Sequence, residues 1–159
     1  MIEFFVGIDP SLTGTGIILI DKDKEIHKQE LVKTKPSMEI EERLHVIMNE
    51  LVFITGIIKP HIYIEGLSYG SMSQRMFQLA GLHYYIRTTL FLNKTKFSII
   101  PPTTLKKWLT GKGNSKKELM ILNCYKKFGV SFNDNNLCDA YCLARMALAD
   151  YEEQNNVKE

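Results

Sequence analysis

Short apolar runs separated by polar or glycine-containing turns occur five times along the chain, a pattern typical of β-strands. The predicted strands are residues 3–9, 15–20, 25–32, 61–65 and 97–100. Only short connections join the first three, such as DKDK at residues 21–24. This spacing predicts an antiparallel meander of three strands.

Longer stretches with apolar residues at every third or fourth position predict helices. One begins near Met38 and ends before Pro60. Its apolar positions are Ile40, Leu44, Ile47, Leu51, Ile54 and Ile58. The other predicted helices are residues 73–92, 103–109, 115–127 and 135–151. Strands followed by strand–helix alternation predict an α/β fold, in which a mixed five-stranded sheet joins the meander to parallel strands and carries helices on both faces.

The length of 159 residues suits one domain with a core of its own. We assign residues 1–151 to this domain and expect the polar segment 152–159 to fray. Hydrophobic residues make up 45% and charged residues 24%, which is typical of globular proteins. No apolar run reaches the roughly 18 residues of a membrane helix, and Glu3 and Asp9 interrupt any N-terminal signal.

The cysteines favour a reducing compartment. Cys124, Cys138 and Cys142 are odd in number and lack the spacing of a disulfide framework. Cys138 and Cys142 lie one helical turn apart, yet we interpret them as small core residues rather than metal ligands. We expect a cytoplasmic protein of a bacterial cell or a phage-infected host.

Positive charge is concentrated in one part of the chain, although the net charge is only +2. Residues 94–127 contain nine lysines and one acid, Glu118, whereas residues 128–159 contain six acids and two bases. A lysine run is often simply a solvated face. Its concentration in one region favours a polyanionic partner.

Three carboxylates occupy the ends of predicted elements. Asp9 ends the first strand, Glu65 ends the fourth, and Asp139 lies in the first turns of an apolar last helix. A lone buried carboxylate costs several kcal/mol unless it is paired or bound to metal. A turn cap, a surface acid and a helix N-terminus would explain each acid separately. Their convergence at one sheet edge instead favours Mg²⁺ ions that assist attack on a phosphodiester.

The stretch GIDPSLTGTG at residues 7–16 also permits a different interpretation, a loop that cradles a nucleotide phosphate. Sugar kinases and actin-like ATPases begin in this way. They enclose the nucleotide between two such domains, and 159 residues leave no room for the second. We therefore expect no nucleotide cofactor.

GIDPSLTGTG, IYIEG and NNLCDAYCLA resemble, in order and spacing, the three acidic motifs of RuvC-type Holliday junction resolvases. PPTTLKKW and GKGNSKKEL resemble the basic segments of that family, and the likeness covers roughly residues 4–150. The resemblance implies an RNase H-like fold, a homodimer and Mg²⁺-dependent paired nicking of four-way junctions. It also implies two Mg²⁺ ions per site, for which Mn²⁺ substitutes.

The resemblance assigns site residues by position. Asp9, Glu65 and Asp139 match the catalytic, metal-binding acids, and Lys106 and Lys117 match basic positions near the scissile phosphate and the DNA backbone. The family usually has a fourth acid one helical turn before the last. Asn136 stands there, so we expect a weak, uncharged metal ligand, unless the nearby Asp134 substitutes for it.

We expect DNA contacts in two places. The loop after Glu65 supplies a wedge in the family, and Tyr69 is the candidate for stacking on an unpaired base, unless it packs on the next helix. The candidate backbone contacts are Lys106, Lys107, Lys112, Lys116 and Lys117. Residues 76–92 carry more apolar side chains than one helix face can bury, which favours either a dimer interface or a helix covered on two sides.

These observations together predict a crossover-junction endodeoxyribonuclease that acts on branched DNA as a homodimer, with no membrane segment. Two alternatives remain open. The chain is a branched-DNA-binding module made inactive by Asn136, or it is a nuclease of the same fold with another substrate, such as a ribonuclease or a flap-cutting enzyme. The small size suits a bacterial or a phage member of the family.

Overall fold

The computed structural model describes residues 3–57, 59–68 and 73–156. The described strands form a single five-stranded sheet. The strands are β1 (Phe4–Asp9), β2 (Gly14–Asp21), β3 (Ile26–Lys33), β4 (His61–Glu65) and β5 (Phe97–Ile100). Their order across the sheet is β3-β2-β1-β4-β5. β1, β2 and β3 pair antiparallel, whereas β4 runs parallel to β1 and β5 parallel to β4. The predicted mixed sheet is confirmed.

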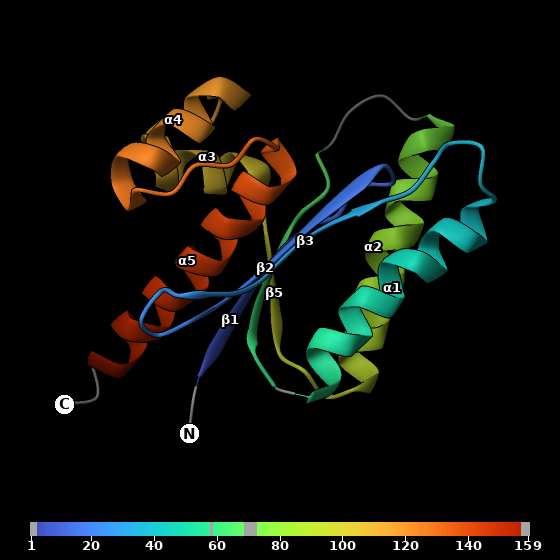
Figure 1. Cartoon of the computed structure of the whole chain (residues 1–159), viewed down its shortest axis with the longest axis horizontal. Coiled ribbons are helices and arrows are strands. Elements are labelled where there is room, and N and C mark those ends of the chain that lie inside the picture. Colours follow the sequence, from blue (N-terminus) through green and yellow to red (C-terminus); the bar gives the residue numbers. More distant parts are fainter. Residues whose placement is uncertain (1–2, 58, 69–72, 157–159) are drawn as a thin grey trace.

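Helices cover both faces of this sheet (Figure 1). They are α1 (Ile40–Ile57), α2 (Gln74–Leu92), α3 (Pro102–Thr110), α4 (Lys117–Phe128) and α5 (Asn135–Asn156). In Figure 1, α1 and α2 lie on one side of the sheet, and α5 lies on the other together with α3 and α4. None of the helices in the described ranges combines the length and apolarity needed to cross a membrane.

The alternation of side chains along the strands divides the core into two layers. Phe5 of β1 belongs to the layer under α5, whereas Val6 and Ile8 belong to the layer under α1 and α2. β4 alternates in the same way, because Tyr63 packs on the α5 side and Ile62 and Ile64 on the other. A side chain at an odd position of β1 or β4 therefore faces α5.

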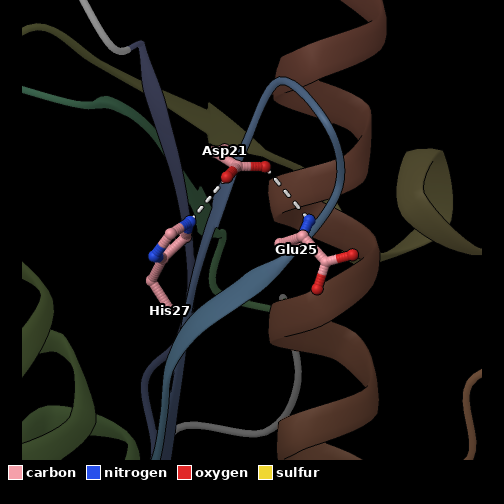
Figure 2. Close-up of polar contacts among 3 residues, drawn as sticks. All are labelled: Asp21, Glu25 and His27. Atoms are coloured by element: carbon pink, nitrogen blue, oxygen red, sulfur yellow. Dashed lines mark hydrogen bonds and ion pairs between the residues drawn. The ribbon is translucent and has the colours of Figure 1, made fainter.

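The connection between β2 and β3 is closed by one carboxylate (Figure 2). Asp21 accepts a hydrogen bond from the backbone N–H of Glu25 at 3.1 Å and pairs with Nε2 of His27 at 2.6 Å. The bond to His27 is the main reason why the pKa of Asp21 is lowered. Lys24 adopts a positive φ of 70° in this turn. The meander is thus held by side-chain contacts as well as by its ladder.

The last helix is longer than the sequence pattern predicts. α5 continues to Asn156, so residues 152–156 are helical where a frayed tail was expected, and residues 157–159 lie outside the described part of the chain. Tyr151 anchors these turns, because its ring lies 5.4 Å from the ring of Phe5 and 4.9 Å from that of His61. Packing on the sheet therefore extends the helix past the point where the apolar pattern ends.

Candidate active site

β1 and β4 bring two of the predicted acids to one edge of the sheet. The strands are parallel neighbours, with Ile8 opposite Ile64, so their last residues, Asp9 and Glu65, end side by side. Both acids occupy odd positions and therefore project toward α5. Asp9 is only 5% exposed, and Glu65 is half-buried.

The third acid reaches this edge because α5 approaches the backbone of the sheet directly. A Cβ atom at Gly7 would lie 1.8 Å from the carbonyl oxygen of Ala140, and one at Gly16 would lie 2.2 Å from that of Asn136. Gly14 and Gly16 belong to β2, and neither has a positive φ. These glycines make room for a helix. They do not form the turn that a phosphate cradle requires.

Asp9, Glu65 and Asp139 form one cluster. Each offers a carboxylate oxygen, and these oxygens all lie within 4.8 Å of one another. The predicted convergence is therefore present in the structure. Three hard oxygen donors at strand and helix ends fit a cation such as Mg²⁺, which prefers carboxylates and keeps several waters. That these residues bind metal stays a prediction.

Burial raises the pKa of all three carboxyls, and repulsion by the neighbouring acids adds to this for Asp9 and Asp139. The pKa of Asp9 lies well above its ordinary value, first because of burial and then because of the Glu65 charge and a hydrogen bond with Glu65. Burial also raises the pKa of Glu65, and burial followed by the Glu65 charge raises that of Asp139 to about 7. A cluster without a cation therefore holds protons near neutral pH. A bound cation would favour the charged forms instead.

Two lysines act on this cluster from the neighbouring helices. Lys117, the first residue of α4, exerts an electrostatic effect on all three acids, and Lys106 of α3 acts on Glu65 and Asp139. Both belong to the residues matched to basic positions near the scissile phosphate. Their positive charges would face a phosphate that approaches the acids.

Asn136 and Asp134 have different tasks at the start of α5. Asn136 Nδ2 donates to the carbonyl oxygen of Gly14 at 2.6 Å, which ties the helix to β2. Asp134 Oδ1 accepts from the backbone N–H groups of Asn136 and Leu137 at 2.8 and 3.2 Å. Asp134 thus caps the helix, and this oxygen is already occupied. The geometry disfavours Asp134 as a substitute for the fourth acid.

The other candidate DNA contacts lie around the turn between α3 and α4. Lys107 is in the last turn of α3, Lys112 follows Gly111, and Lys116 precedes α4. The turn is braced by Thr110 and Ser115, whose hydroxyls lie 2.6 Å apart. The Lys107, Lys112 and Lys116 side chains are exposed. Tyr69 lies outside the described residues.

The sequence analysis missed one residue that supports the site. Arg43 of α1 is only 7% exposed; its Nε donates to Thr34 Oγ1 at 2.9 Å and its Nη2 to the carbonyl oxygen of Leu12. Thr34 Oγ1 donates to the same carbonyl. This arrangement fastens the loop that follows Asp9. No periodicity signalled it, because the three residues are distant in sequence and meet only in the fold.

Curated relatives carry one name. The chain is 32% identical over 146 residues to the crossover junction endodeoxyribonuclease RuvC of Endomicrobium trichonymphae, covering 87% of this chain and 77% of that protein. The chain belongs to the RuvC family. RuvC of Brachyspira hyodysenteriae is 26% identical over 143 residues, or 87% of this chain and 89% of the relative. No protein-family model matches the chain.

A solved structure agrees on the fold of this RuvC-family chain. Thermus thermophilus RuvC, solved in complex with a Holliday junction substrate, superposes with a TM-score of 0.79 over 96% of each chain. At 20% identity this likeness shows the fold alone. The predicted RNase H-like architecture is confirmed.

Proposed function

We propose that this RuvC-family chain is a metal-dependent endonuclease that resolves four-way junctions or related branched DNA by paired nicking. One observation carries the proposal. Asp9, Glu65 and Asp139 bring their carboxylate oxygens within 4.8 Å of one another at the edge of an RNase H-like sheet. The relatives' shared name, crossover junction endodeoxyribonuclease, supports the reaction class.

The cofactor is Mg²⁺, with Mn²⁺ as a substitute, and Asp9, Glu65 and Asp139 hold it. Bound Mg²⁺, two ions in our proposal, supplies Lewis-acid stabilisation of the charge that develops as water displaces the 3′ oxygen. Asp9, on the central strand, suits the position shared between two ions. Asn136 contributes through its amide oxygen, because its nitrogen already donates to Gly14.

The partner is branched DNA. Lys117 contacts the region of the reacting phosphate and Lys106 supports it, since both act electrostatically on the acids. Lys107, Lys112 and Lys116 bind the DNA backbone farther away, and Tyr69 stacks on an unpaired base. The T. thermophilus relative was solved with a Holliday junction substrate, which supports this partner.

Two such chains act as a homodimer, because paired incision needs two sites and one chain holds one set of acids. α2 supports this arrangement. Its side chains Leu82, Ile86 and Leu90 are buried against the sheet, yet other large apolar side chains of the helix stay exposed. These are Phe77, Tyr84, Tyr85, Phe91 and Leu92, with exposed fractions of 61%, 60%, 45%, 74% and 71%. They suit an isologous interface.

The deciding experiment compares cleavage of a labelled four-way junction with cleavage of a linear duplex, each with Mg²⁺ or Mn²⁺. We expect paired nicks in the junction only. Asp9→Asn should abolish cleavage while junction binding survives or tightens, because a negative charge near phosphate is removed. Near wild-type cleavage by Asp9→Asn would show that the site is misplaced.

A second function, junction binding without cleavage, is favoured by one contact. The Asn136 amide is engaged by Gly14 and brings no charge to the metal site. The same assay separates the two functions. Tight junction binding with no nicks at any Mg²⁺ or Mn²⁺ concentration would support the binding module.

A further inference from the structure

All three cysteines of the chain meet at one point between α4 and α5, next to the acid cluster, since the charge of Asp139 acts on Cys138. Cys138 and Cys142 lie one turn apart on α5, and Cys124 faces them from α4. Their sulfur atoms all lie within 4.8 Å of one another. Each side chain is 1% exposed or less. The sequence interpretation as core residues accounts for this burial but not for the convergence of the sulfurs.

The spacing of the sulfurs suits a shared metal ion. Thiolates bound to zinc at about 2.3 Å stand about 3.8 to 4.0 Å apart, so the present spacing needs only small rotations. Two cysteines at i and i+4 on one helix and a third on a facing helix form three corners of a tetrahedron. Among the described residues, no histidine or further acid joins this group, so the fourth position would fall to water or a small thiol.

Charges of both signs act on the cluster, because the negative charge of Asp139 acts on Cys138 and the positive charge of Arg145 acts on Cys124. Three thiolates and one divalent ion carry a net charge of −1, which needs a nearby cation when buried. Arg145 supplies one, because its positive charge acts on Cys124. Its guanidinium lies 4.0 Å from the ring centre of Phe128 and donates to Tyr141 Oη at 2.8 Å. Within the described part of the chain, no carboxylate forms an ion pair with it.

We propose that Cys124, Cys138 and Cys142 form a second metal site, which takes one thiophilic divalent ion of the zinc class. Binding replaces three thiol protons, which pass to the solvent, with three sulfur–metal bonds. The ion joins α4 to α5. It thereby fixes the helix that begins at Lys117 against the helix that carries Asp139.

The test is metal retention by the whole reduced protein. The protein is stripped with a chelator under a phosphine reductant, loaded with Zn²⁺ or Cd²⁺ in excess Mg²⁺, desalted and analysed by elemental mass spectrometry. We expect about one equivalent of ion, and with Cd²⁺ an ultraviolet thiolate-to-metal charge-transfer band. Failure to retain an ion, or purification with a disulfide among these cysteines, would overturn the proposal.

Substitutions locate the ion. Cys124→Ala and Cys142→Ala should each lower the Cd²⁺ band, because one of three sulfur–metal bonds is lost, and weaken binding by more than the ~100-fold that loss of a supporting partner costs. Asp9→Asn is the matched control. It should keep both the Cd²⁺ band and the affinity for the ion, since it alters only the carboxylate cluster. Loss of the ion in Asp9→Asn but not in the cysteine variants would assign it to the carboxylates and refute the site. If the cysteine variants fail to fold, the wild-type Cd²⁺ band alone decides, because carboxylates give none.

Discussion

At the scale of single residues, the candidate active site places three acids where burial disfavours their charged forms. Asp9, Glu65 and Asp139 share a poorly solvated edge of the sheet, and burial is the leading cause of the raised pKa of each. Such a cluster is costly when fully ionised and empty of cations. The structure therefore couples protonation to stability at one place, and the proposed metal binding would be coupled to both.

The first prediction concerns pH. Because the pKa of Asp139 rises from 3.8 to about 7 on folding, the native state holds its proton more tightly than the unfolded chain. The associated stability is present below about pH 4 and is lost as pH rises to about 7. We expect metal-free wild type to lose on the order of 2 to 4 kcal/mol relative to Asp139→Asn over this range. Urea unfolding at several pH values measures it, and saturating Mg²⁺ should suppress the difference. If the unfolding free energies of metal-free wild type and Asp139→Asn changed equally with pH, the prediction would be contradicted.

The second prediction concerns Asn136→Asp. The change removes the 2.6 Å hydrogen bond to Gly14 and adds a fourth negative charge, so metal-free stability should fall by about 1 to 3 kcal/mol. Mg²⁺ should restore more stability than in wild type, and cleavage and Mg²⁺ affinity should rise. Thermal unfolding with and without Mg²⁺ measures this. Asn123→Asp is the control, since Asn123 Nδ2 makes a similar bond to the Leu119 carbonyl at 2.8 Å. Equal Mg²⁺ responses in both variants would argue against a fourth ligand.

At the scale of elements, the site depends on how closely α5 lies on β1 and β2. Gly7 and Gly16 leave no room for a side chain beneath the helix, and the N-terminal half of α5 is almost entirely buried. Asp139 reaches the two strand-end acids only because of this contact. Arg43 supports the same arrangement from the opposite face by holding the loop after Asp9.

The third prediction tests this close approach. Gly7→Ala would place a methyl group 1.8 Å from the Ala140 carbonyl oxygen, which α5 can relieve only by moving away. We expect a loss of about 3 kcal/mol or more in urea unfolding. Gly81→Ala on α2 is the control: a Cβ there meets nothing within 4 Å, so helix propensity should stabilise it by about 1 kcal/mol. Equal changes in unfolding free energy for the two variants would show that α5 does not approach β1 closely at Gly7.

At the scale of the whole molecule, charge and apolar surface are separated. α3, α4 and the turn between them, which carry the proposed DNA-contacting lysines, lie at the end of the sheet where α5 begins (Figure 1). α2, which carries the exposed side chains Phe77, Tyr84, Tyr85 and Phe91, lies on the opposite face of the sheet from α5 (Figure 1). This distribution keeps the proposed DNA surface apart from the proposed dimer surface.

The fourth prediction separates the lysines by their distance from the acids. Lys117→Ala should reduce the cleavage rate more than junction affinity, because Lys117 acts on all three carboxylates. Lys112→Ala, in the exposed turn, should do the reverse. Affinity should fall steeply with salt, each neutralised phosphate adding about 0.9 to the log–log slope. Single-turnover assays measure the cleavage rate, and binding titrations at several salt concentrations measure the junction affinity. A flat salt response would refute the electrostatic interface.

The fifth prediction concerns assembly. Sedimentation at micromolar concentration should give a species near twice 18.3 kDa. Phe77→Ser with Tyr84→Ser should shift it toward the monomer without unfolding it, since both side chains are exposed. Val52→Ser on α1, 45% exposed, is a control for surface polarity. A monomer both free and on junction DNA would exclude paired symmetric cleavage.

Much of this protein could be predicted from local pattern. The strands 61–65 and 97–100 have the predicted limits, and the other elements lie within a few residues of theirs, because alternation and helical spacing are local properties. The three acids were identified for the same reason. Asp9 and Glu65 end strands and Asp139 lies in the first turns of the last helix, and parallel strands end at a common edge. The phage origin, the metal ligands and the DNA contacts stay predictions.

Tertiary structure alone decided the rest, because those contacts join residues far apart in sequence. The glycines near Asp9 look like a turn in sequence, yet they lie under α5, 120 or more residues away. Asn136 acquires its role from Gly14, and Arg43 from Leu12 and Thr34. Cys124 meets Cys138 and Cys142 only where α4 folds against α5. Local pattern determines where elements form, whereas the packing of one element on another decides which side chains share a site.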